Sequence, residues 1–547
     1  MLSLSDLLTT VSSPSTWPTS IWVLALTATA YAGASWANRP SFPRKAPPVF
    51  EAWPIVGALR FFSDRKAFLE EVAAKSHSGQ ASFYYGKLRI IGLSGEDGRR
   101  TFFDSKDLEM EGGYSTLFNA APEISTDERV KIGSKIRKSL AKFMRKENLV
   151  ALTPQLVADA RQTMTTLASR PSQTVDPFDD LYKLVYQLTM RTVGCTEIAG
   201  DAKLLAETLA IFESIDGASA GSKLLVPSWM TTPSHVRRLW AGTKMYLLFK
   251  RIIDQRARDG VRREDALQVL IDQGWDVTDI IAVSGLSEGG LHLHHTRWKL
   301  NTTTLQMEVE TQKTSAEDPT QQIVIAALFA GQVNSGFNAA WLLCYLGQNP
   351  RWRTLVREEV DGVIERHRVS ADQSPADVLS SLTFDEWDVE FPVIDVALRE
   401  TIRHTIVGCG FRQNTSGKDV VIGESGEVVP DGAFAVYLFD DTQMNPHIYK
   451  DPEVWDPDRF LEGREEDKKL DAHGYIGWGS GRHPCFSQQF AKLEMAVMIS
   501  MFVAYFDYHL VDQQGKPTVT TPDMMDRSQH QVHRPTKPIF VKYEPRK

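Results

Sequence analysis

The stretch from Gly477 to Ser487 reads Gly-Trp-Gly-Ser-Gly-Arg-His-Pro-Cys-Phe-Ser, and it decides the fold. Its glycines let the backbone turn tightly and approach a flat ligand without a Cβ clash. The turn presents Cys485 just before a long helical pattern that begins at Gln488. A thiolate at a helix N-terminus is stabilised by the helix dipole and by free amide donors. Cys485 is therefore either a nucleophile or an axial ligand of haem iron.

The residues ahead of the cysteine decide between these two chemistries. An aromatic residue, two glycines and two basic residues stand at fixed distances before it: Trp478, Gly479, Gly481, Arg482 and His483. This pattern resembles the haem-binding loop of the cytochrome P450 monooxygenases. The resemblance implies that Cys485 binds the iron of haem b. It also implies that the five residues just named belong to the cofactor-binding loop.

Two residues depart from the loop that is usual in that family. Ser487 stands where a glycine is usual, two residues after the cysteine, and Pro484 directly precedes the cysteine. Neither change removes the ligand. Both change the stiffness of the loop and the hydrogen bonds that tune the sulfur.

Two further motifs precede the loop in the expected order. Glu400 and Arg403 are three residues apart, which places them on one face of a helix. Arg459 follows in the segment Asp456–Phe460. The motifs resemble the Glu-x-x-Arg helix and the Pro-x-Arg-Phe segment of the same family. The resemblance implies that the three charged residues form a buried network behind the haem, since buried arginines need a shared carboxylate.

The longest apolar helical pattern in the body of the chain extends from Gln321 to Leu346. Inside it, residues 330–336 read Ala-Gly-Gln-Val-Asn-Ser-Gly. This stretch resembles the family's distal helix, which crosses over the haem and leaves a groove for oxygen.

The resemblance implies catalytic roles for Gly331, Asn334 and Ser335 on this helix. Most members of the family have an acid–alcohol pair here that relays protons. In this chain the pair is replaced by Val333 and Asn334, with Ser335 next. Valine cannot relay a proton, and asparagine can hydrogen-bond but is a poor acid.

The N-terminal segment predicts a membrane anchor. No charged residue occurs between Asp6 and Arg39, and this run is long enough to cross a bilayer. Basic residues and a proline-rich stretch follow it, which resembles the hinge of family members in the endoplasmic reticulum. The positive-inside rule then leaves the catalytic domain in the cytosol. We expect a single-pass anchor over residues 1–39 and a catalytic domain over residues 40–547, with an amphipathic or disordered leader as the alternative.

The resemblance implies one large, mostly α-helical fold with small β-sheets, and the length and composition are compatible with it. The 547 residues are 42% hydrophobic, which is ample for a core. A net charge of −8 gives no indication of nucleic-acid binding. The four cysteines have no paired spacing, as is usual in the reducing cytosol: Cys195, Cys344, Cys409 and Cys485.

Residues 284–318 interrupt the pattern of family helices with a stretch of odd composition and no clear period. Long insertions of this kind are usually disordered. We expect a disordered surface loop, with retained intron sequence as the alternative.

A basic stretch runs from Arg129 to Lys146, with eight basic residues and no acid. Its position resembles the family helix that contacts the haem propionates and helps to dock an acidic reductase. Because the chain has no flavin or dinucleotide fingerprint, the resemblance implies NADPH–cytochrome P450 reductase as the electron donor. The alternative for most of these residues is a solvated basic face.

The motifs lean toward the sterol 14α-demethylase-like branch and look closest to its fungal members that oxidise secondary metabolites. We therefore expect a monooxygenase that inserts oxygen from O2 into a fairly large apolar substrate. The alternatives are a peroxide-rearranging enzyme of the same fold, a sterol 14α-demethylase-type enzyme, and a haem sensor or carrier without turnover. The missing acid–alcohol pair favours the first alternative. The basic stretch and the anchor argue against the last.

Overall fold

The computed structural model describes most of the chain: residues 37–51, 53, 56–117, 138, 140–216, 233–272, 297–301, 306–310, 323–518 and 525–546, and residues 22, 29, 30, 33 and 34. Among them, no helix has both the length and the apolar character that a bilayer crossing requires. Most of residues 1–39 lie outside the described ranges. The anchor therefore stays a prediction.

A large helical lobe is built around the longest apolar helix, α15 (Ile323–Gln348). It packs most extensively against α9 (Pro177–Val193), α19 (Pro392–Thr405) and α21 (Gln488–Tyr505). The helix predicted over residues 321–346 is confirmed to within two residues. The other helices of this lobe are α8 (Lys146–Ala168), α10 (Thr196–Gly200), α11 (Ala202–Asp216), α12 (Pro233–Asp259), α13 (Ala266–Asp272), α16 (Pro350–His367), α17 (Pro375–Ser381) and α18 (Phe384–Val389).

The central helices are buried because their sequences are apolar on nearly every side. From Ala339 to Leu346, every side chain of α15 is buried. The start of α9 is fixed locally, because Asp176 accepts a hydrogen bond from the Phe178 amide at 2.9 Å and Pro177 occupies the first turn. The core of the lobe thus sits between α9, α15 and α21, beside the predicted site.

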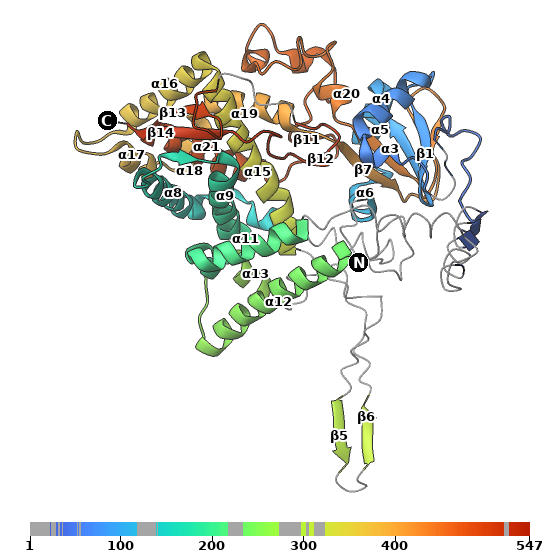
Figure 1. Ribbon diagram of the computed structural model, residues 1–547, viewed down its shortest axis with the longest axis horizontal. Helices are drawn as coiled ribbons and strands as arrows, with labels where there is room; N and C mark the ends of the chain where they lie inside the picture. Colours follow the sequence, from blue (N-terminus) through green and yellow to red (C-terminus); the bar gives the residue numbers. More distant parts are fainter. Residues whose placement is uncertain are drawn as a thin grey trace, which may run out of the picture.

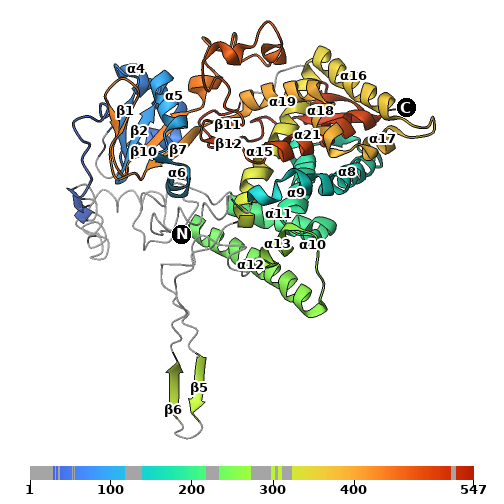
Figure 2. The same ribbon diagram turned by 180° about the vertical axis from the view of Figure 1, so that it is seen from behind.

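A smaller lobe contains a five-stranded sheet in the order β1-β2-β10-β7-β3. Strand β10 runs parallel to β2 and antiparallel to β7. Figures 1 and 2 show this sheet beside short helices at the opposite end of the molecule from α16 and α17. The lobe comprises β1 (Ala81–Tyr85), β2 (Leu88–Leu93), β3 (Leu108–Glu109), β7 (Cys409–Asn414), β10 (Phe434–Leu438), α3 (Arg60–Ser63), α4 (Arg65–Lys75), α5 (Gly95–Asp104) and α6 (Met110–Leu117).

The remaining elements are short. One three-stranded sheet, in the order β13-β14-β4, and two-stranded pairs complete the fold. The predicted class, mostly helical with small sheets, is confirmed. These elements are β4 (Thr174–Val175), β8 (Val420–Val421), β9 (Val428–Val429), β11 (Gly479–Ser480), β12 (His483–Pro484), β13 (Phe506–Val511), β14 (Phe540–Pro545), α20 (Asp440–Gln443), and the 3-10 helices η3 (Pro457–Phe460) and η4 (Glu466–Lys469).

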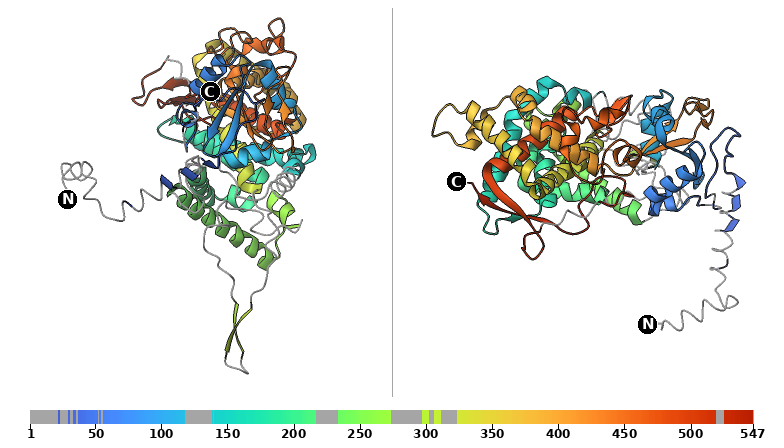
Figure 3. Two further views of the ribbon diagram at one scale, coloured as in Figure 1. Left: turned by 90° about the vertical axis from the view of Figure 1, so that its right-hand side faces the viewer. Right: turned by 90° about the horizontal axis from the view of Figure 1, so that it is seen from above.

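The insertion contains a β-hairpin rather than only a disordered loop. Strands β5 (Arg297–Asn301) and β6 (Gln306–Glu310) pair antiparallel, with Trp298 opposite Val309. The hairpin projects away from the body of the molecule (Figures 1 and 3). Large apolar residues alternate with polar ones in both strands, a period of two that is typical of β-structure and that we missed. The rest of residues 284–318 lies outside the described ranges.

Candidate haem-thiolate site

The loop before Cys485 is a tight β-hairpin between the two lobes (Figure 2). Its strands β11 and β12 pair Gly479 with Pro484. Gly479 and Gly481 adopt φ values of +69° and +58°, which other residues rarely adopt. A Cβ atom on Gly479 would collide with the His483 carbonyl oxygen, and one on Gly481 would collide with the Phe103 carbonyl oxygen. Both glycines predicted for the cofactor loop are therefore required by its shape.

The loop delivers Cys485 to the start of α21. The Cys485 amide donates a hydrogen bond to the Trp478 carbonyl oxygen at 2.7 Å, which closes the turn. Cys485 is partly exposed, whereas Cys195, Cys344 and Cys409 are buried. Burial raises the pKa of the Cys195 and Cys409 thiols to about 12, which opposes thiolate formation there. Of the four cysteines, Cys485 is thus the one placed for thiolate ligation.

The other predicted loop residues contribute in different ways. Trp478 is partly buried and packs against the main core. The Arg482 amide donates to the Phe103 carbonyl oxygen at 3.0 Å and ties the loop to α5, while its side chain is exposed. His483 is partly exposed in β12, two residues before the cysteine.

The structure brings the three residues of the predicted charged network together. Glu400 accepts two hydrogen bonds from Arg403, at 2.8 and 2.9 Å, and one from Arg459 at 3.0 Å. The Asp456 amide adds a fourth donor at 3.0 Å. All three charged side chains are at most 1% exposed. Burial opposes ionisation of Glu400, but the Arg403 charge and its hydrogen bonds lower the pKa of Glu400 to about 2.

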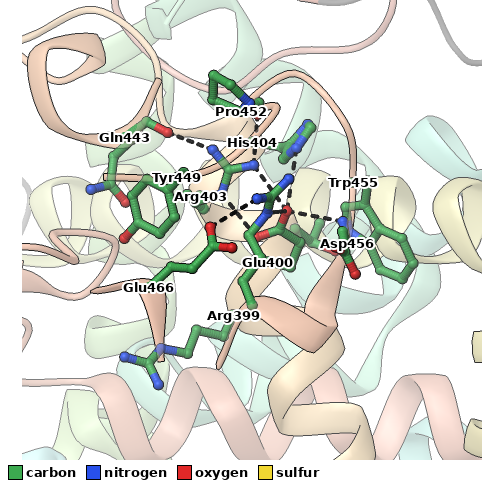
Figure 4. Close-up of polar contacts among 12 residues, drawn as sticks. Arg399, Glu400, Arg403, His404, Gln443, Tyr449, Pro452, Trp455, Asp456 and Glu466 are labelled. Carbon is green, nitrogen blue, oxygen red and sulfur yellow. Dashed lines mark hydrogen bonds and ion pairs between the residues drawn. The ribbon is translucent and has the colours of Figure 1, made fainter. Parts of the chain in front are cut away.

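The remaining donors of the two arginines are satisfied as well. Arg459 also pairs with Glu466 at 3.0 Å. The other guanidinium N–H groups donate to main-chain carbonyl oxygens of Gln443, Lys450, Asp451, Pro452 and Val454. Figure 4 shows Arg403, Asp456, Glu466 and the carbonyl groups of Gln443 and Pro452 gathered around Glu400. A buried ion network is stable only when its donors and acceptors are satisfied in this way.

This network supports the chain that leads into the cysteine loop. The Tyr449 hydroxyl donates to the Gly474 carbonyl oxygen at 2.6 Å, and Tyr449 lies against the Arg403 guanidinium. The Tyr475 hydroxyl donates to the Arg399 carbonyl oxygen at 3.1 Å. The segment before Gly477 is therefore held to α19 at Arg399, the residue next to Glu400, and through Tyr449 at Arg403.

The predicted distal residues lie on α15 but face different ways. Asn334 is exposed, whereas Ser335 is 3% exposed. Gly331 allows close packing, since a Cβ atom there would lie 3.3 Å from the Thr189 methyl group of α9. Val333 is buried in the core. Successive helical residues point about 100° apart, so Asn334 can be exposed while the adjacent Ser335 is buried.

A buried carboxyl group that we did not predict lies behind this stretch. Glu494 of α21 is fully buried, and neither of its oxygens makes a hydrogen bond of good geometry with the described residues. Burial raises the pKa of Glu494 to about 8, although the Ser335 and Thr189 hydroxyls lower it in part. The sequence did indicate this residue, because Glu494 is the one acidic residue in the apolar run Phe490–Tyr505.

A Glu494→Gln variant tests whether the pKa of Glu494 is raised, because the stability of the wild type should then depend on pH. Below pH 4.5 the carboxyl is neutral in both the folded and the unfolded protein. As pH rises from 4.5 to 8, the unfolded chain releases the proton while the folded chain keeps it. The free energy of unfolding of the wild type should therefore fall, relative to the variant, by about 1.4 kcal/mol per pH unit in this window. Denaturant unfolding at several pH values measures the difference.

The exposed acid Glu358 on α16 provides the control. Its Glu358→Gln variant should track the wild type across the same pH range. Parallel curves for the wild type and Glu494→Gln would mean that the Glu494 carboxyl is ionised in the folded protein at neutral pH.

The residues present fit a haem. Arg412 of β7 is 4% exposed and forms no ion pair with the described residues, and its Nε has no partner there. Burial lowers the pKa of Arg412, so the charged form lacks compensation. Its guanidinium lies over the Phe102 ring at 4.6 Å, next to Phe103, whose carbonyl oxygen binds the cysteine loop. A buried cation beside the loop suits a propionate group of haem, and an accessible cysteine suits its iron.

The predicted basic stretch is described only at its end. Lys138, Lys142, Arg145 and Lys146 are exposed, and Lys146 forms an ion pair with Asp385 at 2.5 Å. The four other basic residues lie outside the described ranges. Contact of this basic stretch with a haem propionate or with a reductase therefore stays a prediction.

Comparisons with known proteins identify the family of the chain. The family model "Cytochrome P450" matches residues 47–543. Cytochrome P450 monooxygenase AacuE of Aspergillus aculeatus is 27% identical over 506 residues, or 90% of this chain and 92% of that protein. Cytochrome P450 monooxygenase dmxR5 of Cryptosporiopsis sp. is 27% identical over 515 residues, or 93% and 91%. Obtusifoliol 14-alpha demethylase of Triticum aestivum is 28% identical over 427 residues, or 77% and 83%. The chain therefore belongs to the cytochrome P450 family and is a monooxygenase whose cofactor is a haem held by a cysteine thiolate.

Proposed function

We propose that this monooxygenase inserts an oxygen atom from O2 into a fairly large apolar substrate, in fungal secondary metabolism, with Cys485 as the iron ligand. One observation carries the assignment of the ligand. Cys485 is the partly exposed cysteine, and a glycine hairpin places it at the N-terminus of α21. The fungal relatives, which are cytochrome P450 monooxygenases, support the reaction class.

Each part of the site then has a role. Haem held by the Cys485 thiolate would supply the activation of O2. The hairpin fixes the direction of the Cys485 side chain. The network around Glu400 keeps the segment before the hairpin in place. Arg412 would neutralise a propionate.

Protons must reach the oxygen site without the usual acid of the distal helix. Glu494 is a buried acid whose pKa of about 8 keeps it protonated at neutral pH. The Ser335 and Thr189 hydroxyls lower the pKa of the Glu494 carboxyl in part. A hydroxyl group can accept one proton and donate another. Asn334 on the exposed face of α15 can hold water by hydrogen bonds. We infer that the proton moves from Glu494 through Ser335 to water held beside Asn334.

An Asn334→Ala/Ser335→Ala double variant tests this route. We expect NADPH to be consumed while peroxide replaces product, because the oxygen site loses its proton supply. Proton transfer of this kind is worth on the order of 10²–10⁴ in rate. The measurement is product formed per NADPH consumed.

Thr192→Ala is the matched packing control. The Thr192 hydroxyl is buried in α9 and, among the residues that the structure describes, bonds only its own helix, at 3.0 Å to the Leu188 carbonyl oxygen. Unchanged coupling in the double variant would exclude the route. It would favour protons from the substrate or from solvent.

We further propose that electrons come from NADPH through a separate cytochrome P450 reductase, and that the protein is anchored in the endoplasmic reticulum membrane with its catalytic domain in the cytosol. The exposed basic residues Lys138, Lys142 and Arg145 support docking of an acidic partner. The uncharged N-terminal segment supports the anchor.

The competing function is peroxide rearrangement without O2 or a reductase. The buried Val333 favours it, because valine stands where the family usually has an acid. Oxygen consumption by the haem-loaded protein with reductase and NADPH separates the two functions. NADPH-dependent oxygen uptake with formation of an oxidised product supports the monooxygenase. Turnover of a fatty-acid hydroperoxide with no oxygen uptake under any reductase condition would overturn it.

A further inference from the structure

The serine that replaces the usual glycine after Cys485 points its hydroxyl at the sulfur. Ser487 Oγ lies 3.6 Å from Cys485 Sγ, within hydrogen-bonding distance for a sulfur acceptor. Ser487 is the residue before α21, with φ −103° and ψ 17°, and a serine there would ordinarily cap the helix. Its side chain caps no amide of α21. The hydroxyl is therefore directed to the sulfur rather than to the helix.

Two neighbouring main-chain positions cannot donate a hydrogen bond to the sulfur. Pro484 has no N–H group, and the Cys485 amide already donates to the Trp478 carbonyl oxygen. Within the described residues, the hydrogen bond that reaches Sγ comes from Ser487. A sulfur bound to iron has no proton, so in this pair the hydroxyl must be the donor.

We propose that Ser487 is a positioning residue that tunes the haem by donating a hydrogen bond to the Cys485 thiolate and so raising the reduction potential of the iron. The proposal rests on the assignment of Cys485 as the iron ligand. A thiolate pushes electron density onto the metal and favours the oxidised iron. A hydrogen bond to the sulfur withdraws part of that density, so it favours the reduced iron. A glycine at position 487 would lack this effect.

The test is an anaerobic redox titration of the purified, haem-loaded, full-length protein. Ser487→Ala should lower the equilibrium constant for iron reduction by about tenfold, a shift of about 59 mV for one electron. Ser487→Thr keeps the hydroxyl and should match the wild type. Ser500→Ala removes a buried hydroxyl elsewhere on α21 that has no partner within the described residues, and it should also match the wild type.

The outcomes separate this inference from the proposed function. A Ser487→Ala variant with the wild-type potential would overturn the role of Ser487, and so would a Ser487→Thr variant that shifts as far as Ser487→Ala. A wild-type protein whose reduced carbonyl complex lacks the red-shifted Soret band of thiolate ligation would overturn the assignment of Cys485 and this inference with it.

Discussion

A Glu400→Gln variant should lose about 3–5 kcal/mol of folding free energy, because it removes the carboxylate from a fully buried ion network. Arg459 would keep Glu466 as a partner. Arg403 would keep only neutral hydrogen-bond partners for a guanidinium that is 0% exposed. Glutamine has nearly the same volume as glutamate, so the loss reports charge and hydrogen bonding rather than packing.

Denaturant unfolding of the purified protein measures the loss, and the haem content of the same preparation should fall with it. The exposed pair Glu365–Arg368 provides a matched control, since it has the same spacing of three residues and an N–O distance of 3.3 Å. Glu365→Gln should change stability little, because solvent screens exposed pairs. If Glu400→Gln lost no more stability than Glu365→Gln, the network would not be the support of the cysteine loop that we describe.

The parts of the site that depend on local backbone geometry could be predicted from the sequence. The hairpin before Cys485 follows from glycines that must adopt positive φ values, and the helix after it follows from apolar periodicity. Glu400 and Arg403 share a helix face because they are three residues apart. The position of Arg459 could not be predicted from residue spacing alone. Its contact with Glu400 was implied by the resemblance to the family's motifs, and the 3.0 Å distance agrees with that expectation.

The parts that depend on packing between distant segments could not be predicted. Glu494, Ser335 and Thr189 come from three different helices, so no sequence interval brings them together. The sequence also did not identify Arg412 as a site residue, because an arginine within a strand is usually solvated. Its burial without a carboxylate partner among the described residues is what indicates a role in the site. The hairpin of the insertion was missed for another reason, since each of its strands is only five residues long.

Loss of thiolate ligation in a Cys485→Ala variant is the second large effect that we expect. The alanine side chain cannot bind iron, and the three other cysteines are too buried to replace it. Cys409→Ala is the matched control, because Cys409 is 2% exposed at the start of β7 and is not the cysteine that we assign as the iron ligand. Its substitution should leave the haem spectrum of the wild type intact.

The Soret band of the reduced carbonyl complex reports whether a cysteine thiolate binds the iron. We predict that the wild type and Cys409→Ala both show the red-shifted band of a thiolate-bound haem, and that Cys485→Ala does not. A Cys485→Ala variant that keeps this band, or a Cys409→Ala variant that loses it while remaining folded, would contradict the assignment of Cys485 as the iron ligand.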